Sequence, residues 1–218
     1  MKIIEQSVEI IYPRTLAQGV QELKHIEAAG RNCWRSEGRI TDDSYKTFVN
    51  GLLARGHGSP IEFGHIILKI VTSRDVMAEL TRHRIASFAI ESQRYVDEYA
   101  EGDIYFIRPL FYKEDPDDPL HAFDDRQFYA SMVWQDTMEN AEQSYKHLRE
   151  LGMKNEDARK VLPNSTATTI FMNINLRELL HDYELRSSKA AYPDMRKCKE
   201  LLKKEVDEVL PGLLPDEE

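Results

Sequence analysis

Residues 82 to 94, RHRIASFAIESQR, are more informative about the chemistry of the chain than any other stretch. Arg82, His83 and Arg84 stand side by side, and serine and arginine side chains follow within the same segment. Arginine forks match phosphate oxygens in pairs, and serine hydroxyls can complete such a site. Because the whole chain carries a formal net charge of -9, this local group of cations indicates a dedicated anion site. We therefore predict a small phosphorylated ligand, such as a nucleotide.

A second group of residues that could do chemistry occupies positions 57 to 62, HGSPIE. Gly56 and Gly58 free the backbone, and Ser59 followed by Pro60 is typical of a helix start, with serine as the N-cap. A helix N-terminus suits a phosphate or the polar edge of a flavin ring. Taken alone, the same residues are also consistent with an ordinary capped turn, so both interpretations stay open.

A third group lies towards the C-terminus. It begins with Arg159, and continues with Asn175, Arg177 and His181 near the start of one predicted helix and Arg186 just past its end. An arginine beside a pyrimidine could bond a carbonyl oxygen and stabilise charge that develops on the ring. Asn175 is equally consistent with a helix cap, and Arg186 with a solvated helix end.

Glu79 belongs to the first group because it precedes Arg82 and His83 by three and four residues. On a helix, that spacing places the three side chains on one face. A surface ion pair is the simpler interpretation, and it would stabilise the helix by less than ~1 kcal/mol. The basic residues that follow favour a ligand site over an isolated ion pair.

Hydrophobic periodicity predicts the elements that must position these groups. Strands are predicted at residues 2–12, 65–72, 92–99, 104–108 and 166–172. Helices are predicted at residues 16–34, 41–55, 73–80, 124–151, 155–161, 176–185 and 193–210. A turn at 100–103 should join two of the strands, and the acidic segment 113–121 should be a surface loop. The predicted class is α+β, a mixed or antiparallel sheet packed with long helices, in a single domain over residues 1–218.

The composition is that of an ordinary globular protein, with 41% hydrophobic and 31% charged residues. The negative net charge argues against a protein that binds duplex nucleic acid. No apolar run approaches the roughly 20 residues that a membrane span needs. The N-terminal segment also lacks the unbroken apolar stretch of a signal peptide. We therefore expect no nucleic-acid partner, no membrane partner and a cytoplasmic location.

The two cysteines, Cys33 and Cys198, cannot form a disulfide scaffold or a four-cysteine zinc site, and we predict no metal site. Cys198 shares a predicted helix face with Met195, Leu202 and Val206, so we expect it to be a buried apolar residue. Cys33 could be reactive, but no neighbouring residue requires it.

Taken together, these motifs resemble the signature of the flavin-dependent thymidylate synthase family. The family motif of RHR, seven residues and then SxRY is matched at residues 82–95. Its HxSPxEH motif is matched at 57–63 except for the last position, and its NxRxLxHxxxLR motif at 175–186. A stretch of the form R-x-(V/L)-L-P is matched at 159–163. The matches occur in the family's order and cover most of residues 31–196.

The resemblance implies a reaction in which dUMP is methylated to dTMP. Methylenetetrahydrofolate would give the carbon, NADPH would reduce the flavin, and reduced FAD would supply the hydride, so the cofactor would carry the redox chemistry. The resemblance further implies a homotetramer with active sites shared between chains, in which cofactor binding and assembly are coupled.

The resemblance also assigns roles by motif position. Residues that would contact FAD are Ser59, Glu62, Arg82, His83, Arg84, Ile85, Asn175, Arg177 and His181. Residues that would hold dUMP are Glu79, Arg82, Glu91, Ser92, Gln93, Arg94, Arg159 and Arg186.

Three residues would be catalytic. Arg186 would stabilise negative charge on the ring when carbon 5 becomes nucleophilic, and His57, like Tyr95, would lie near the flavin and the folate. Ser92 stands at a nucleophile's motif position, but we favour a ligand-positioning role because the sequence offers it no evident base.

The chain departs from the family pattern in three places. Glu79 stands where glutamine is expected, so its carboxylate should contact a sugar hydroxyl or Arg82 and not a phosphate. Phe63 replaces the last histidine of the second motif, and residues 191–196 follow the family pattern only loosely.

Two other functions stay open on the residues alone. A flavin reductase that binds a nucleotide would oxidise NADPH without needing dUMP. A non-catalytic nucleotide or RNA-binding module would use the basic segment together with Tyr95 for base stacking.

Overall fold

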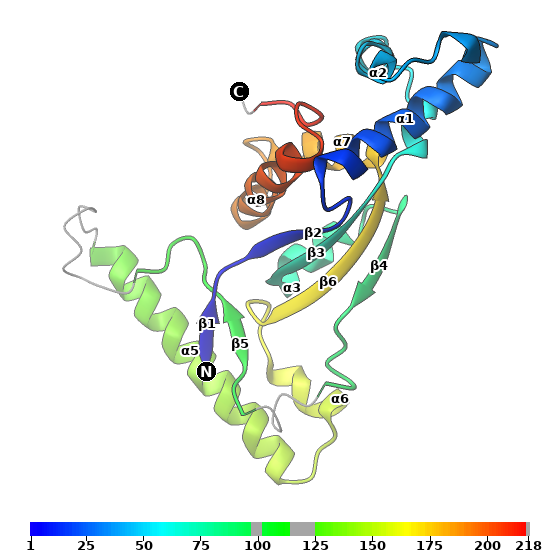
Figure 1. The fold of residues 1–218 in the computed structure, drawn as a ribbon. Helices are drawn as coiled ribbons and strands as arrows, with labels where there is room; N and C mark the ends of the chain where they lie inside the picture. The colour runs from blue at the N-terminus through cyan, green and yellow to red at the C-terminus, as the bar shows by residue number, and fades with distance from the viewer. Residues whose placement is uncertain (97–101, 114–124, 217–218) are drawn as a thin grey trace. The chain divides into compact units, whose positions relative to one another are not determined.

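The computed structural model describes residues 1–96, 102–113 and 125–216. The chain divides into two compact units, and each is described by itself. Unit 1 comprises residues 1–6, 71–78 and 90–169, and unit 2 comprises residues 7–70, 79–89 and 170–218. Figure 1 shows the elements of both units along the chain.

A four-stranded sheet carries most of the strands, in the order β2-β3-β6-β4 (Figure 1). Its members are β2 (Ser7–Tyr12), β3 (His65–Ser73), β4 (Ala86–Ile90) and β6 (Ala167–Asn175). In β3 and β6 every second side chain is buried, for example Ile66, Leu68 and Ile70 in β3. Successive side chains of a strand point to opposite faces, so this alternation gives the sheet one packed face.

The helices of unit 2 are amphipathic. They are α1 (Leu16–Cys33), α2 (Ser44–Ala54), α7 (Leu176–Ser187) and α8 (Pro193–Val209), with the short 3-10 helices η1 (Glu37–Arg39) and η2 (Ser59–Phe63). The buried stripe of α8 includes Met195, Cys198 and Leu202, as the sequence predicts.

One glycine allows α1 to approach the end of α8. A Cβ atom at Gly19 would lie 1.9 Å from the carbonyl oxygen of Val209, which no side chain could tolerate without a backbone shift. The two helices pack against each other at this point because glycine has no Cβ.

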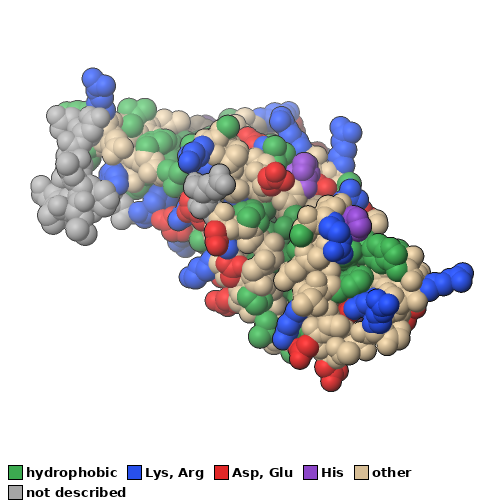
Figure 2. All heavy atoms as spheres, turned by 90° about the horizontal axis from the view of Figure 1, so that it is seen from above, with side chains coloured by type: hydrophobic (Ala, Val, Ile, Leu, Met, Phe, Trp, Pro, Cys, Tyr) green, Lys and Arg blue, Asp and Glu red, His purple; other side chains and the backbone are tan. Residues whose placement is uncertain are grey.

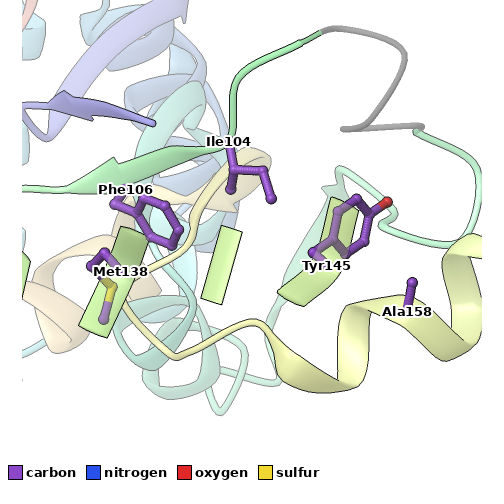
Figure 3. Close-up of a cluster of buried hydrophobic side chains, with 5 residues drawn as sticks. All are labelled: Ile104, Phe106, Met138, Tyr145 and Ala158. Carbon is purple, nitrogen blue, oxygen red and sulfur yellow. The ribbon is translucent and has the colours of Figure 1, made fainter. Parts of the chain in front are cut away.

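Unit 1 contains a long helix and a small parallel sheet. Its elements are β1 (Lys2–Ile4), β5 (Tyr105–Ile107), α5 (Asp125–Glu150), α6 (Asn155–Ala158) and the 3-10 helix η3 (Arg159–Val161). Strands β1 and β5 pair in parallel. Figure 3 shows the buried cluster of this unit, which consists of Ile104, Phe106, Met138, Tyr145 and Ala158.

The remaining helix, α3 (Arg74–Leu80), leads into the basic segment and spans the boundary between the two units. The structure confirms the prediction of helix α3 and of the other long helices. It also confirms the strands predicted at 65–72 and 166–172. The long helix α5 ends at Glu150, close to its predicted end, and Gly152 follows with a φ of 85°.

Three predictions of local structure are wrong. The single strand predicted at 2–12 is two strands, separated by Glu5 and Gln6. Residues 92–96 form a turn instead of a strand, because the carbonyl oxygen of Ser92 accepts from the backbone N–H groups of Tyr95 and Val96. The predicted hairpin is therefore absent there, and β5 pairs with β1 instead.

Ser59 is the first residue of η2 and not an N-cap, a position that Gly58 occupies without a side-chain hydrogen bond. Residues 97–101 of the predicted hairpin and 114–121 of the predicted loop lie outside the described residues. Within the described ranges, no helix is long and apolar enough to cross a membrane.

Candidate active site

The basic segment begins with a tight turn at the end of α3. The backbone N–H of Arg82 donates to the carbonyl oxygen of Glu79 at 3.2 Å, and that of His83 donates to Leu80 at 3.1 Å. The turn exposes Arg82 and Arg84 to solvent and buries His83, which is 4% exposed. The three adjacent motif residues therefore have different environments.

His83 is held between two carboxylates of α7. Its Nδ1 atom lies 3.1 Å from Glu178 Oε1, and its Nε2 atom lies 3.1 Å from Asp182 Oδ1. The two acids are four residues apart, so they project from the same face of the helix. His83 thereby attaches the turn at 82–84 to α7, and both of its ring nitrogens contact carboxylates of unit 2.

Asp182 is also paired with a cation from α8. Lys199 Nζ lies 2.5 Å from Asp182 Oδ2, and both side chains are 1% exposed. Burying a single charge is very costly, so each of these groups depends on the other for compensation. We call His83, Glu178, Asp182 and Lys199 the buried charge cluster.

Arg186 lies in the last turn of α7. The prediction that it lies just past the end of this helix is therefore wrong. Its Nη1 atom is 2.5 Å from Glu79 Oε2, its Nη2 donates to the carbonyl oxygen of Glu79 at 3.3 Å, and its Nε lies 3.4 Å from His83 Nε2. Of the two contacts expected for the Glu79 carboxylate, the one with Arg82 is wrong, since the carboxylate pairs with Arg186, and the one with a sugar hydroxyl stays a prediction. This pairing holds the guanidinium in a fixed direction at the edge of the buried charge cluster.

The first turn of α7 meets the glycine-containing segment that precedes η2. Arg177 Nη1 lies 2.5 Å from Glu62 Oε1, and a Cβ atom at Gly58 would lie 2.7 Å from Arg177 Nε. Glycine at position 58 therefore lets the arginine lie across the backbone. Asn175 is the N-cap of α7, and its side chain accepts from the backbone N–H of Glu178 at 2.9 Å, which confirms the capping interpretation.

A pocket of about 220 Å³ lies beside this contact in unit 2. Its lining includes His57, Gly58, Arg177, Leu180 and His181. His57 and His181, both exposed, bring imidazole groups to the pocket, and His181 also contacts the His83 ring edge-on, with centroids 6.1 Å apart. The pocket thus joins two of the predicted motifs.

The predicted nucleotide residues of unit 1 begin at Glu91. Its backbone N–H donates to the carbonyl oxygen of Thr169 at 2.9 Å, and its Oε2 accepts from the Thr169 N–H at 3.2 Å. Ser92 Oγ accepts from the backbone N–H of Arg94 at 3.3 Å. Within the described ranges, no histidine or carboxylate hydrogen-bonds to this hydroxyl.

Gln93 and Arg94 differ in how far their polar groups are satisfied. Gln93 is 6% exposed, and its Nε2 has no hydrogen-bond partner among the described residues. An unpaired buried amide is costly, so this donor is available to a ligand oxygen. Arg94 pairs with Glu156 at 3.4 Å and lies 5.6 Å from the centre of the exposed Tyr95 ring.

Arg159 is half-buried at the start of η3, and its side chain makes no ion pair within the described part of the chain. The predicted flavin-contacting residues all belong to unit 2. The predicted dUMP residues divide between the units, with Glu79, Arg82 and Arg186 in unit 2 and residues 91–94 and Arg159 in unit 1.

Two groups of charged residues were missed by the sequence reasoning. One is the buried pair of Asp182 and Lys199, for which the only signal is that Lys199 adjoins Cys198 on the apolar stripe of α8. The other is a set of arginines at positions 31, 35 and 39, together with Arg55. The spacing of Arg31, Arg35 and Arg39 by four residues in an acidic chain could have revealed this set.

Comparison with known proteins identifies the family. The family model Thy1, described as thymidylate synthase complementing protein, matches residues 15–212. A flavin-dependent thymidylate synthase of Haloarcula marismortui is 33% identical over 75% of this chain and 71% of its own length. The chain belongs to the flavin-dependent thymidylate synthase family.

Other relatives and solved structures agree with this assignment. The flavin-dependent thymidylate synthase of Nitratidesulfovibrio vulgaris is 30% identical over 91% of this chain and 83% of its own length. The UMP/dUMP methylase PolB from Streptomyces cacaoi, bound with 5-Br dUMP, superposes with a TM-score of 0.78 at 23% identity, covering 98% of this chain and 95% of that one.

Thymidylate Synthase X from Helicobacter pylori, solved with FAD and dUMP, gives a TM-score of 0.72 at 23% identity, covering 97% of this chain and 98% of that one. These likenesses confirm the predicted α+β class and the fold of the flavin-dependent thymidylate synthases. The contribution of each motif residue to ligand binding stays a prediction.

Proposed function

We propose that this chain methylates dUMP to dTMP, with methylenetetrahydrofolate as carbon donor and NADPH as the reductant of a bound FAD. The observation that carries the proposal is the family match over residues 15–212, within which the RHR motif presents two exposed arginines. Arg82 and Arg84 make no ion pair with any described residue, so their forks are available to an anionic ligand.

The exposed residues of unit 2 fit a flavin dinucleotide. Arg82 and Arg84 would bind its phosphates, and the 64% exposed side chain of Ile85 would offer an apolar surface to its ring. Arg177, His181, Ser59 and Glu62 would supply the polar contacts, whereas His83 and Asn175 would act by holding the turn and the helix in place. When bound, FAD would supply the hydride of the reaction.

We further propose that the active site is shared between chains of a homotetramer, with residues 1–218 as one domain in each. The pocket beside Arg177 holds about 220 Å³, and pockets for cofactors typically hold about 300–1,000 Å³. This pocket alone is too small for a whole flavin cofactor, which supports a site completed by a second chain. Exposed hydrophobic residues are also available for assembly, among them Phe63 in unit 2 and Tyr129 and Val133 in unit 1.

The nucleotide would be held by hydrogen-bond donors of unit 1 and by arginines. Gln93 Nε2 would satisfy its unused donor on a substrate oxygen, and Ser92, Arg94 and Arg159 would contribute further donors. Glu79 and Glu91 would accept from sugar hydroxyls, since carboxylates repel phosphate.

Arg186 is the residue that we assign to the chemical step. Its guanidinium would bond the uracil edge and stabilise the negative charge that develops when carbon 5 attacks the donated carbon. His57 and Tyr95 would border the flavin and the folate. Ser92 would position the ligand, because no histidine or carboxylate among the described residues hydrogen-bonds to its hydroxyl.

Anaerobic NADPH oxidation tests the proposal directly. The protein is mixed with FAD and methylenetetrahydrofolate, with and without dUMP, and dTMP is assayed in the same samples. Oxidation that rises with dUMP and yields dTMP is the expected result. Oxidation that is indifferent to dUMP and gives no dTMP would indicate a flavin reductase instead.

The RNA-binding alternative and the oligomeric state need separate measurements. A non-catalytic module would bind single-stranded RNA and show no affinity for FAD. Sedimentation equilibrium with and without FAD should give a tetramer, and a variant that stays monomeric should lose activity.

A further inference from the structure

A second and larger pocket in unit 2 is lined by arginines. It holds about 580 Å³ and lies where the end of α1, helix η1 and the end of α2 come together. Its lining includes Arg31, Trp34, Arg35, Arg39, Phe48 and Arg55, and we call it the arginine pocket. The motif-based assignments give none of these residues a role.

One of its four arginines is structural. Arg31 donates from Nε and Nη2 to Glu27 Oε1 at 3.0 and 2.9 Å, and its guanidinium lies 4.5 Å from the centre of the Phe48 ring. Glu27 is buried, so Arg31 compensates a buried carboxylate. Its charge is already used within the fold.

The other three arginines are available. Arg35, Arg39 and Arg55 are exposed, and their side chains make no hydrogen bond or ion pair within the described ranges. Residues 31–39 contain three arginines and one carboxylate, that of Glu37, so cations outnumber carboxylates in this segment. Three uncompensated arginines around one pocket form a local positive potential in an acidic protein.

Two stacked rings, one lining each pocket, connect the arginine pocket to the proposed active site. Trp34, which lines the arginine pocket, stacks on His57 with ring centroids 6.0 Å apart and planes inclined by 23°. His57 also lines the smaller pocket beside Arg177 and His181. A ligand that places a flat ring near His57 could therefore extend a charged chain past Trp34 to the arginines. Figure 2 shows basic side chains next to hydrophobic ones on one face of the molecule.

We propose that the arginine pocket binds the anionic tail of an aromatic co-substrate whose ring lies beside His57. The tail must carry at least two negative charges, because the free arginines come from separate segments and each guanidinium matches one carboxylate or phosphate group. This inference rests on the proposed function, which supplies two such molecules. They are a folate with its glutamate carboxylates and a pyridine dinucleotide with its phosphates.

Substitution of the exposed arginines tests the inference. The variants are Arg39→Ala, Arg55→Ala and the double variant, and Arg14→Ala is the control because Arg14 is an exposed arginine of unit 2 outside the pocket. Arg35 is left unchanged because its φ of 48° makes any substitution there a backbone change as well. Thermal unfolding of each variant should match that of the wild type.

The two sources of the tail are distinguished by their KM values. Methylenetetrahydrofolate is used with one glutamate and with several, and NADPH is compared with NADH, which lacks one phosphate. If the tail is the folate's, the double variant should raise the KM of the polyglutamate by about tenfold and leave that of NADPH unchanged. If it is the dinucleotide's, the KM of NADPH should rise more than that of NADH. In either case kcat should change by less than about twofold, since the pocket binds and does not react.

The inference is wrong if the wild type makes dTMP and the double variant leaves every KM within about twofold of its original value. A wild type that makes no dTMP would contradict the proposed function instead. The pocket is then tested by Trp34 fluorescence in a Trp134→Phe background, because these are the two tryptophans of the chain. Quenching by folate polyglutamate or NADP⁺ that is lost in the double variant supports the pocket, and the absence of quenching overturns it.

Discussion

Two charged regions of unit 2 follow opposite electrostatic rules. In the buried charge cluster, His83 lies beside the carboxylates of Glu178 and Asp182, and Asp182 also pairs with Lys199. The side chains of His83, Asp182 and Lys199 are almost fully buried. In the arginine pocket, Arg39 and Arg55 are exposed and have no partner within the described residues. A buried charge needs compensation for the protein to fold, whereas an exposed uncompensated charge costs little and remains available to a ligand. Substitutions in the first region should therefore affect folding, and those in the second should affect binding.

The largest effect is expected when the buried pair is broken. Lys199→Ala leaves Asp182 buried without its ammonium partner, and should lower the free energy of unfolding by about 3–5 kcal/mol. Urea denaturation measures this change. The double variant Asp182→Leu, Lys199→Met should recover most of the loss, since no buried charge remains on either helix. A loss below about 1 kcal/mol in Lys199→Ala would show that water reaches Asp182.

The next effect lies at the edge of the cluster, at Arg186. Arg186→Ala should retain FAD but lower kcat for dTMP formation by roughly 10²–10³-fold, the usual consequence of removing one donor to a developing anion. FAD binding is followed by its absorbance after gel filtration, and dTMP by chromatography. Full activity in this variant would remove the charge-stabilising role that we assign to Arg186.

Adjacent residues of the RHR motif give a sharper comparison. His83→Ala removes a buried ring that joins two elements, and should lower the free energy of unfolding by about 2–3 kcal/mol. Arg82→Ala should leave the melting temperature unchanged and weaken FAD binding by about tenfold. Differential scanning fluorimetry and FAD titration are applied to both variants. Equal losses of stability in the two variants would contradict the separation of folding and binding within the motif.

The smallest effect concerns the two cysteines. Burial raises the pKa of the Cys198 thiol to about 11, so at mildly alkaline pH this thiol stays protonated as well as inaccessible. Cys33 is exposed. A thiol-reactive dye should therefore label one cysteine in the native protein and both in denaturant. Native labelling of Cys198, detected by peptide mapping, would indicate that the core around Lys199 opens readily.

The helices could be predicted from the sequence because their evidence is local. The apolar stripe of α8, the Asn175 cap and the glycine at position 152 all lie within a few residues of the element that they define. Strand pairing, in contrast, depends on residues that are distant in the sequence. Residues 92–99 have a strand-like composition, but residues 92–96 pair with no strand and form a turn. The predicted hairpin was wrong because β5 pairs with β1, which lies about a hundred residues earlier in the sequence.

The site shows the same limit. The motifs predicted which side chains belong together, and α7 indeed carries Arg177, His181 and Arg186. The sequence could not predict that His83 is buried while Arg82 and Arg84 are exposed, because all three are polar and adjacent. That difference is set by Glu178 and Asp182, which are distant in sequence. The pairing of Glu79 with Arg186 is likewise a product of tertiary structure.

The close packing of Gly19 against Val209 also bears on the order in which the protein can be made. Helix α1 is translated well before α8, the helix whose end packs against it. All segments of unit 1 are translated before α7 and α8, so unit 1 can fold while synthesis continues. The turn at 82–84 must wait for α7 before His83 has its partners. A nascent chain that stalls before α7 would therefore display the RHR motif without the helix that holds His83 in place.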